Sequence, residues 1–244
     1  MAVINTQGGK NSENRIKLYV LQNVLNSMCR MGFVSTTAIV DQTKIIRDAS
    51  RFYSDENPDG FGYAYLYQNR IIYYSKTRES ANQYWARNPQ TRIFSHLSLF
   101  HDRRASVGSI SNSNSHPFVR DEVALAHNGT LHNYEALKSH LIQKGFVFTS
   151  QTDSEILLAA WLFYKGKFIN VLKKWGVGGK ITTIILTLKG IYLYTNNDAM
   201  VVYKTKDSLM GFSDTRFKGV EGASYIHPDV LYFVVGNNIV SARN

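Results

Sequence analysis

The sequence predicts an α+β domain in which layers of helix cover antiparallel sheets. From residue 29 onward, short β-rich runs alternate with helical patterns, and the last third of the chain supplies several more strands. Many antiparallel strands with helices inserted between them are typical of this fold class. The length of 244 residues is enough to bury a sizeable core, and it fits one large domain better than two small ones.

The first half of the domain is delimited by periodicity and by turn residues. The apolar residues that predict the first helix lie on one face: Ile45, Ile46, Ala49 and Phe52. The turn signal Asn57-Pro58-Asp59-Gly60 precedes two β-rich runs separated by Gln68-Asn69, which predicts a hairpin. In chain order we expect a strand at 32–36, a helix at 41–53, hairpin strands at 61–67 and 70–74, a helix at 80–87, an extended segment at 91–100 and a buried strand at 123–127.

The second half continues with two helices and then a series of strands. The helices are expected at 133–144 and 154–161. Gly176-Val177-Gly178-Gly179 predicts a flexible break between these helices and the strands. The strands are expected at 182–188, 191–196, 200–204 and 230–235.

Composition excludes several classes of protein. A hydrophobic content of 44% with 19% charged residues is ordinary for a soluble globular chain, and no run approaches the roughly 18 apolar residues that a membrane-spanning helix needs. The formal net charge is +10, but the positive residues are scattered and no basic run is interleaved with aromatics. We therefore expect a solvated positive surface, with no membrane partner and no support for nucleic acid.

Cys29 is the only cysteine of the chain. An internal disulfide and a zinc site built on several thiolates are therefore excluded. Because a secreted protein stapled by disulfides is not expected, we place the chain in the cytoplasm. The sequence implies neither a metal nor an organic cofactor.

The first 28 residues differ in character from the rest of the chain. Residues 1–14 are polar and rich in Gly and Asn, and 15–25 contain an apolar segment without the small-residue cleavage site of a secretory signal. Met28 stands directly before Cys29. We divide the chain into residues 1–28, an N-terminal extension, a propeptide or a stretch upstream of the true start, and a domain at 29–244.

Several polar motifs have two interpretations when each is taken alone. A single cysteine such as Cys29 is more often a small buried apolar residue than a nucleophile. His127-Asn128-Gly129 fits a type I′ hairpin turn. Thr152-Asp153-Ser154-Glu155 fits a capping box, with Thr152 at the N-cap and Glu155 three residues later. Arg103 and Arg104 would ordinarily be solvated.

Six motifs stand in order between residues 28 and 155. They are Met28-Cys29-Arg30-Met31-Gly32, Asp59-Gly60-Phe61-Gly62, His101-Asp102-Arg103-Arg104-Ala105-Ser106-Val107-Gly108, His116-Pro117-Phe118, Ala126-His127-Asn128-Gly129 with Asn133-Tyr134, and Thr152-Asp153-Ser154-Glu155. Together they resemble the motifs of class II glutamine amidotransferases, particularly the stand-alone, single-domain type that begins Met-Cys-Arg.

This resemblance implies an N-terminal-nucleophile hydrolase fold, in which two antiparallel sheets are sandwiched between helical layers in the order αββα. It also implies a glutaminase reaction. The Cys29 thiol would attack the side-chain amide of L-glutamine, form a glutamyl thioester and release ammonia, and water would then free glutamate. The base would be the free α-amino group of the nucleophile, whose reference pKa of about 7.7–8.0 suits catalysis near neutral pH.

The resemblance assigns roles to further residues. Asn128 and the backbone N–H of Gly129 are expected to form the oxyanion hole for the developing negative charge. Arg103 is expected to hold the substrate α-carboxylate with its two-pronged donor geometry, and Asp153 is expected to pair with the substrate ammonium group. Together these two charges would select a free amino acid over an amide within a peptide.

The chain departs from the family pattern at several positions. Ser106 stands where the family often has Thr. Both Ser106 and His127 are expected to contact the substrate. Arg104 replaces a bulky aromatic residue, so closure over the substrate is expected to differ. Cys29 is followed by Arg30, as in the smaller subgroup, rather than by Gly as in multidomain relatives.

The largest departure is the segment before Cys29, which places the required amine in a peptide bond. Three accounts stay open. Translation begins at Met28 and methionine removal exposes Cys29, or residues 1–28 are a propeptide removed by self-cleavage, or they are retained and the domain is inactive.

The leading functional hypothesis is a glutaminase that delivers ammonia. Its partners would be L-glutamine and either a separate ammonia-accepting synthase or ligase or none, with free release of ammonia. Two alternatives stay open: an amidase for another γ-glutamyl amide, and a catalytically inactive hydrolase-fold module that binds a ligand or partner.

Overall fold

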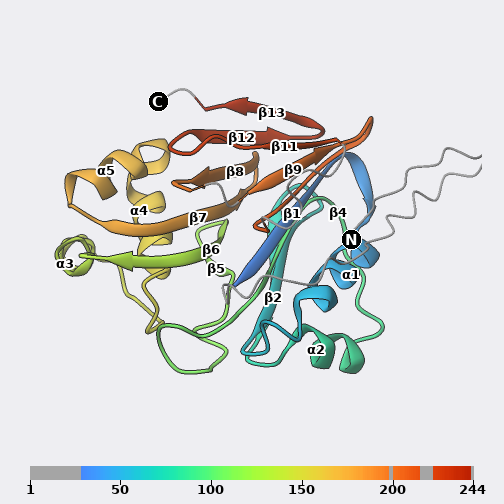
Figure 1. The fold of residues 1–244 in the computed structure, drawn as a ribbon, viewed down its shortest axis with the longest axis horizontal. Helices are drawn as coiled ribbons and strands as arrows, with labels where there is room; N and C mark the ends of the chain where they lie inside the picture. Colours follow the sequence, from blue (N-terminus) through green and yellow to red (C-terminus); the bar gives the residue numbers. More distant parts are fainter. Residues whose placement is uncertain (1–28, 198–199, 215–221, 243–244) are drawn as a thin grey trace, which may run out of the picture.

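Two antiparallel sheets lie face to face and are covered on their outer sides by helices (Figure 1). The computed structural model describes residues 29–197, 200–214 and 222–242. The predicted extension at 1–28, including Met28, lies outside the described residues. The α+β class and the four-layer αββα order expected from the sequence are both observed.

The first sheet has the strand order β11-β9-β10-β1-β4-β2-β3. Its strands are β1 (Arg30–Asp41), β2 (Phe61–Tyr67), β3 (Ile71–Thr77), β4 (Phe94–Asp102), β9 (Val201–Lys204), β10 (Ser208–Phe212) and β11 (Ala223–Tyr225). At its centre β1 and β4 pair antiparallel, with Arg30 opposite Asp102. The start of β1 and the end of β4 therefore lie side by side, which brings Cys29 next to Arg103 and Arg104.

The second sheet has the strand order β13-β12-β8-β7-β6-β5. Its strands are β5 (Phe118–Arg120), β6 (Val123–His132), β7 (Gly178–Thr187), β8 (Gly190–Thr195), β12 (Leu231–Val235) and β13 (Asn238–Ser241). β7 pairs with the whole length of β6, whereas the short β5 pairs with β6 only from Val123 to Leu125. Beyond Leu125, the edge of β6 that faces away from β7 has no partner strand among the described residues.

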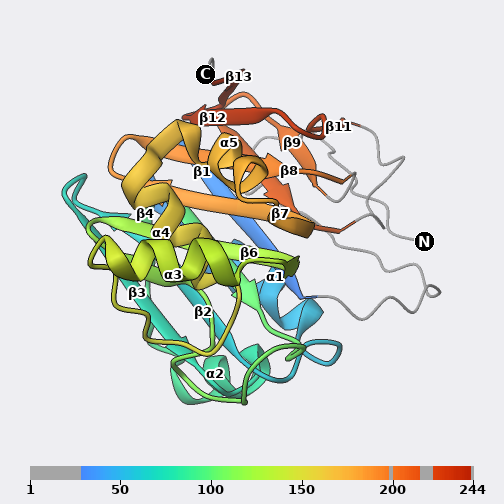
Figure 2. The same cartoon turned by 90° about the vertical axis from the view of Figure 1, so that its left-hand side faces the viewer.

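Helices cover the two outer faces unequally. The helices are α1 (Thr43–Tyr53), α2 (Ala81–Arg87), α3 (Glu135–Gln143), α4 (Glu155–Tyr164), the 3₁₀ turn η1 (Lys165–Lys167) and α5 (Phe168–Lys174). α1 and α2 pack on the first sheet, and α3, α4 and α5 gather over the second (Figure 2). None of the helices in the described part of the chain is long and apolar enough to cross a membrane.

Strand alternation divides the buried residues into three cores. Met31 and Phe33 of β1 face the core between the sheets, while Val34 faces the core under α1 and α2. A third core lies between the second sheet and α3, α4 and α5. Each fully buried side chain of this size contributes roughly 1.5–3 kcal/mol. Three such cores hold the four layers in fixed relation.

Every helix and strand expected from the sequence is present, most with shifted bounds. The hairpin at Gln68-Asn69 is confirmed, and both residues have the positive φ angles, 49° and 59°, that a type I′ turn requires. The break at 176–179 is wrong in its second half, because β7 begins at Gly178. The elements β5, β10, β11, β13, η1 and α5 were not expected.

Two local interpretations of the polar motifs are wrong. His127-Asn128-Gly129 is not a hairpin turn, because all three residues lie inside β6. Thr152 is not the cap of α4, because the N-cap is Ser154 and no side-chain capping bond forms. The Glu155 carboxylate instead accepts hydrogen bonds from the backbone N–H groups of Thr149 (3.0 Å) and Ser150 (2.7 Å). It therefore fixes the turn that leads into α4.

Candidate active site

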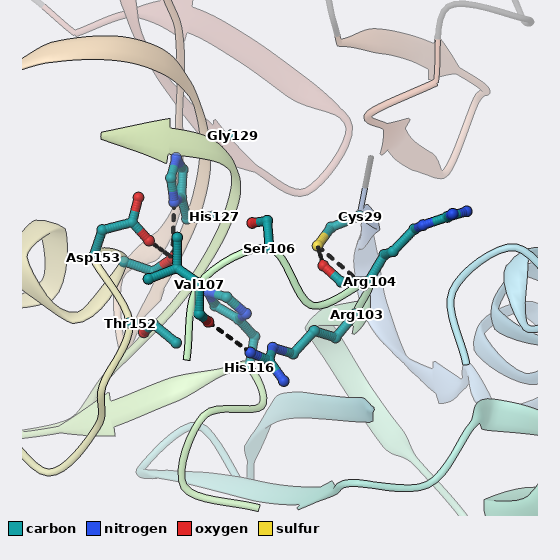
Figure 3. A pocket seen from close by; sticks show the side chains of 11 residues that line it. Cys29, Arg103, Arg104, Ser106, Val107, His116, His127, Gly129, Thr152 and Asp153 are labelled. Atoms are coloured by element: carbon teal, nitrogen blue, oxygen red, sulfur yellow. Dashed lines mark hydrogen bonds between the residues drawn. The ribbon is translucent and has the colours of Figure 1, made fainter. Parts of the chain in front are cut away.

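A depression between the ends of the two sheets contains most of the predicted site residues (Figure 3). Its walls come from the start of β1, the segment after β4, the middle of β6 and the segment that enters α4. The residues that line it are Cys29, Arg103, Arg104, Ser106, Val107, His116, His127, Gly129, Thr152, Asp153 and Ser154. Of the seven predicted site residues, only Asn128 is not part of this lining.

Strand alternation sends the candidate nucleophile and the candidate cation into the same space. Met31 of β1 and Leu99 of β4 both face the core between the sheets. Side chains alternate along a strand, so Cys29 and His101 follow the same direction, and Arg103 follows His101. Cys29 stands just before β1, and His101 and Arg103 stand two residues apart where the neighbouring β4 ends. They therefore meet at one end of the first sheet.

Cys29 is half-buried and is held by the backbone of Arg104. Its Sγ lies 3.3 Å from the Arg104 carbonyl oxygen and 3.3 Å from the Arg104 backbone nitrogen. Burial raises the pKa of the Cys29 thiol, while the Arg104 N–H and the nearby Arg103 charge act in the opposite direction. The thiol therefore rests protonated and has two groups beside it that stabilise a thiolate once it forms.

The backbone of Gly129 points toward the open edge of β6. Its register partner in β7 is Ile181, whose N–H donates to Asn196 Oδ1 (2.8 Å) and whose carbonyl accepts from Asn196 N–H (2.9 Å). Since both backbone groups of Ile181 face away from β6, this is a non-hydrogen-bonded pair of the antiparallel ladder, and the Gly129 groups face away from β7. His127, two residues earlier, has the same orientation: its carbonyl faces away from β7 and accepts a hydrogen bond from His101 Nε2.

No other residue fits at position 129. Gly129 has φ +144°, and a Cβ there would collide with the Lys180 carbonyl oxygen. The close approach of β7 thus demands glycine, while the same geometry turns an N–H into the depression. That donor is suited to a developing negative oxygen.

Asn128 projects between the sheets, like Ala126 two residues before it. Its side chain is buried, and Nδ2 donates to Ser213 Oγ at 3.3 Å. The Oδ1 atom has no hydrogen-bond partner among the described residues. Asn128 therefore lies behind the lining, between the two lining residues His127 and Gly129.

Arg103 crosses the floor of the depression (Figure 3). It is 3% exposed, and its guanidinium donates from Nη2 to the Val107 carbonyl (2.9 Å) and from Nη1 to the Ser109 carbonyl (3.2 Å). An arginine has five N–H donors, so donors remain for an anionic ligand. Ser106 is exposed on the loop that these bonds hold, and Figure 3 shows it between Cys29 and His127.

Asp153 and His127 form the wall on the side of α4. Asp153 Oδ2 accepts from the Leu131 N–H at 2.5 Å, so a buried carboxylate is fixed beside the Gly129 backbone. His127 Nε2 lies 3.2 Å from the Lys180 carbonyl, and Nδ1 lies 2.9 Å from Ser154 Oγ. The carbonyl requires a proton on Nε2, so the Ser154 hydroxyl donates to Nδ1. Burial lowers the pKa of His127, partly offset by Asp153.

At the inner side of the depression lies a group of buried polar side chains that received no role from the sequence, and one of them, His116, also belongs to the lining. The rings of His101 and His116 stack with centroids 4.1 Å apart, and neither nitrogen of His116 has a hydrogen-bond partner in the described ranges. Burial lowers the pKa of His101 to about 3 and that of His116 well below its ordinary value. Asp102 points the other way, is 0% exposed, and has its pKa raised by burial.

The residues missed by sequence reasoning differ in the signal that they gave. His101 and His116 stand inside two of the six motifs, so their positions were visible although their burial was not. Ser213 and Asp214, which contact the site from the end of β10, gave no signal, because β10 itself was not predicted. No group of three or more His, Cys, Asp or Glu side chains within residues 29–197, 200–214 and 222–242 is arranged to hold a metal ion.

The sequence profile described as glutamine amidotransferases class-II matches residues 28–165. A glutamine--fructose-6-phosphate aminotransferase [isomerizing] of Acinetobacter baylyi is 33% identical over 130 residues, which are 53% of this chain and 21% of that protein. The protein of the same name from Helicobacter pylori is 29% identical over 221 residues, 85% of this chain and 34% of that protein. The matched region thus spans a fifth to a third of these relatives.

Solved structures show the same fold. A glutamine phosphoribosylpyrophosphate amidotransferase from B. subtilis, complexed with ADP and GMP, superposes with a TM-score of 0.69 at 19% identity and covers 88% of this chain and 49% of its own. A glutamine aminotransferase class-II domain protein from Silicibacter pomeroyi has a TM-score of 0.60 at 16% identity, with 88% of this chain and 98% of its own covered.

Proposed function

This chain belongs to the class II glutamine amidotransferases, and we propose that it hydrolyses the side-chain amide of L-glutamine to glutamate and ammonia through a Cys29 thioester. One observation carries the proposal. The Cys29 thiol, the Arg103 cation, the Asp153 carboxylate and the Gly129 backbone line a single depression. A nucleophile, an oxyanion donor and a charge for each end of an amino acid are the parts that this reaction needs.

Substrate recognition would use the two buried charges. The remaining donors of Arg103 would bind the α-carboxylate, and Asp153 would pair with the α-ammonium group. Ser106 would add a hydrogen bond to the bound glutamine. Both ring nitrogens of His127 are used within the protein, so this residue would act on the substrate by holding the wall that carries Asp153 and Gly129.

The chemical step would begin with transfer of the thiol proton to the free α-amino group of Cys29. The sulfur then attacks the amide carbon, and the oxyanion is bound by the Gly129 N–H and by Asn128. When the carbonyl reforms, the proton passes to the leaving nitrogen, and ammonia departs from the glutamyl thioester. Water, deprotonated by the same amine, attacks the thioester and releases glutamate with the free thiol.

This mechanism requires Cys29 to be the first residue of the mature protein. We propose that residues 1–28 are absent from the active form, either because translation begins at Met28 or because the segment is a propeptide. The domain at 29–244 would then act as a stand-alone enzyme. Intact-mass measurement of the natural protein tests this, since a mass that retains residues 1–28 in an active enzyme contradicts it.

The fate of ammonia is a separate question. We propose that it is either released or passed to a separate synthase or ligase, and that the enzyme works in the cytoplasm, where a free thiol stays reduced. Affinity capture of the natural protein at several salt concentrations tests delivery, because no enrichment of an ammonia-accepting enzyme would contradict it. Cell fractionation tests the location, and recovery outside the cytoplasm would overturn it.

The decisive experiment measures glutamate release from L-glutamine by the full chain and by a chain that begins Met28-Cys29, with each N-terminus confirmed by mass. Activity of the short form alone identifies Cys29 with its free amine as the catalyst. Cys29→Ala serves as the matched control and should fold and bind glutamine without turnover. Residual turnover in that variant rules out Cys29 as the nucleophile. Two folded but inactive forms would leave the fold as a binding module.

A further inference from the structure

Ser213 lies immediately after β10 and touches both halves of the candidate catalytic centre. It is 3% exposed. Its Oγ lies 3.1 Å from the backbone nitrogen of Met31 and 3.3 Å from Asn128 Nδ2. Its own backbone N–H donates to the Met31 carbonyl at 2.9 Å. One hydroxyl group thus joins the strand that begins beside Cys29, in the first sheet, to an amide side chain of the second sheet.

This hydroxyl accepts the hydrogen bond that orients the Asn128 amide. Asn128 Oδ1 is buried without a hydrogen-bond partner in the described part of the chain, so the amide is held through its Nδ2 end. An amide has two N–H donors, and one of them is directed to Ser213, which leaves the second for another acceptor. Because the Asn128 amide is hydrogen-bonded to described residues at one end only, this bond determines the orientation of the amide group at the end of the side chain.

The next residue holds the other side of the nucleophile. The Asp214 carboxylate lies 3.7 Å from Arg30 Nε, and Arg30 Nη1 donates to the Cys29 carbonyl at 3.4 Å. Both members of this pair are buried. Ser213 therefore fixes the backbone of Met31, and Asp214 acts on the Cys29 carbonyl through Arg30. Ser213 also contacts Asn128 of the second sheet.

We infer that Ser213 is a positioning residue for the oxyanion hole: its hydroxyl sets the rotation of the Asn128 amide relative to the strand that carries Cys29. The inference rests on the proposed glutaminase activity and deepens it. Without the hydroxyl, the Asn128 amide loses its one hydrogen bond to a described residue, and its donor then points toward the oxyanion for only part of the time. Arg103 and Asp153, which would bind the amino acid ends, do not touch Ser213.

Kinetics of Ser213→Ala test the inference on the proposed active form, which begins at Cys29, with the N-terminus confirmed by mass. We expect kcat for glutamine hydrolysis to fall about tenfold, which is part of the roughly 10²–10³-fold loss caused by removal of an oxyanion donor. KM should stay within about twofold. Ser208→Ala, the matched change at the start of β10 where Ser208 bonds Thr205, should leave both constants unchanged. Full activity of Ser213→Ala would overturn the inference.

A double-mutant cycle separates positioning from general weakening of the fold. In an Asn128→Ala background, Ser213→Ala should cause no further loss of kcat, because its effect passes through the missing amide. A second tenfold loss there would show that Ser213 acts elsewhere. Alkylation of Cys29 by iodoacetamide forms no oxyanion, so its rate should be the same in wild type and Ser213→Ala. A parallel fall in alkylation would assign Ser213 to the nucleophile instead.

A crystal structure of Ser213→Ala gives a readout that does not depend on turnover. We expect the Asn128 amide to leave its position while β1 and β10 stay paired. An unmoved Asn128 would overturn the inference even if the wild-type chain proved inactive. Absence of wild-type glutaminase activity with a displaced Asn128 would instead reject the proposed function and keep the structural role of Ser213.

Discussion

At the scale of single residues, Gly129 combines two requirements that would ordinarily conflict. The β7 strand approaches it so closely that any side chain would meet the Lys180 carbonyl, and its φ of +144° is one that other residues rarely adopt. The same residue has to present an N–H to the depression from inside a paired strand. Glycine meets both requirements, since it lets the strand continue while the ladder turns that N–H outward.

We therefore predict that Gly129→Ala loses both stability and turnover. The strained φ alone costs roughly 1–3 kcal/mol, and displacement of β7 adds to it. Gly178→Ala on the paired strand is the matched control, because a Cβ there meets nothing within 4 Å. Urea unfolding and glutamate release measure the two effects. A Gly129→Ala protein as stable as Gly178→Ala would contradict the close contact.

Arg103 leads to a second prediction at this scale. Arg103→Lys keeps the charge but loses the planar fork that serves two backbone carbonyls and, in the proposed complex, a carboxylate at once. Loss of one charged hydrogen bond costs about 1.5–3 kcal/mol, so KM for glutamine should rise roughly 10- to 100-fold with a smaller change in kcat.

The control is Arg92→Lys, since Arg92 also donates to backbone carbonyls, those of Pro89 and Thr91, but is exposed and does not line the depression. Its KM should match that of the wild type. An Arg103→Lys enzyme with an unchanged KM would remove Arg103 from carboxylate binding.

At the scale of elements, sequence patterns located the strands and helices that carry strong periodicity and missed those defined by their neighbours. The hairpin at Gln68-Asn69 is local, so turn residues sufficed. β10 is five residues long and exists because it pairs with both β1 and β9. Such pairing is set by residues far away in the chain and leaves no local signature. Ser213 was missed with it.

At the start of α4, the capping-box pattern correctly indicated that Glu155 has a structural role but predicted the wrong hydrogen bonds for it. Glu155 was expected to cap the helix with Thr152, but its carboxylate binds the Thr149 and Ser150 N–H groups of the preceding turn. We predict that Glu155→Gln, which keeps one acceptor oxygen and turns an NH2 donor toward a backbone N–H donor, lowers the free energy of unfolding by about 1–3 kcal/mol. It should also raise KM, because this turn leads directly into Asp153.

Thr152→Ala is the matched test of the rejected capping box. Thr152 makes no capping bond to the helix, so the loss of stability should be clearly smaller than for Glu155→Gln. Thermal unfolding compares the two. A larger loss for Thr152→Ala would restore the capping box.

At the scale of the whole molecule, the family resemblance of the ordered motifs implied the four layers and named the candidate site residues, but it did not indicate the electrostatics behind them. The motifs name His101, Asp102 and His116, and nothing in their spacing indicates that all three are buried. Burial depends on how two sheets pack together, which a single sequence does not encode locally. The pKa shifts of these groups result from that packing.

Stability should accordingly fall in mild acid. The pKa values of His101, His116 and His127 are lowered in the folded protein, so the unfolded chain binds more protons below about pH 6.5. Stability is therefore complete above that pH and decreases as the pH falls toward the folded values, by up to about 1.4 kcal/mol per pH unit for each ring. Urea unfolding between pH 7.5 and 4 measures this slope.

The exposed His132 provides the control, since His132→Gln should leave the slope unchanged while His116→Gln makes it shallower. Asp102 has the opposite sign. Its raised pKa means that its stability contribution is present in acid and lost as the pH rises, so Asp102→Asn should stabilise the protein near pH 7. Equal acid slopes in wild type and His116→Gln would contradict burial of a neutral ring.

The early end of β5 has a wider meaning. An unpaired strand edge normally invites another polypeptide to add to the sheet, and proteins protect themselves against it. Here the unpaired stretch of β6 lies beside a thiol, a guanidinium and a carboxylate. A bound glutamine that accepts a hydrogen bond from the Gly129 N–H would satisfy one backbone group of this edge, as a neighbouring strand satisfies many. The centre can thus be regarded as an open position in a sheet, and an amino acid that carries a γ-electrophile and keeps its free α-ammonium and α-carboxylate groups would compete for it as a strand of one residue.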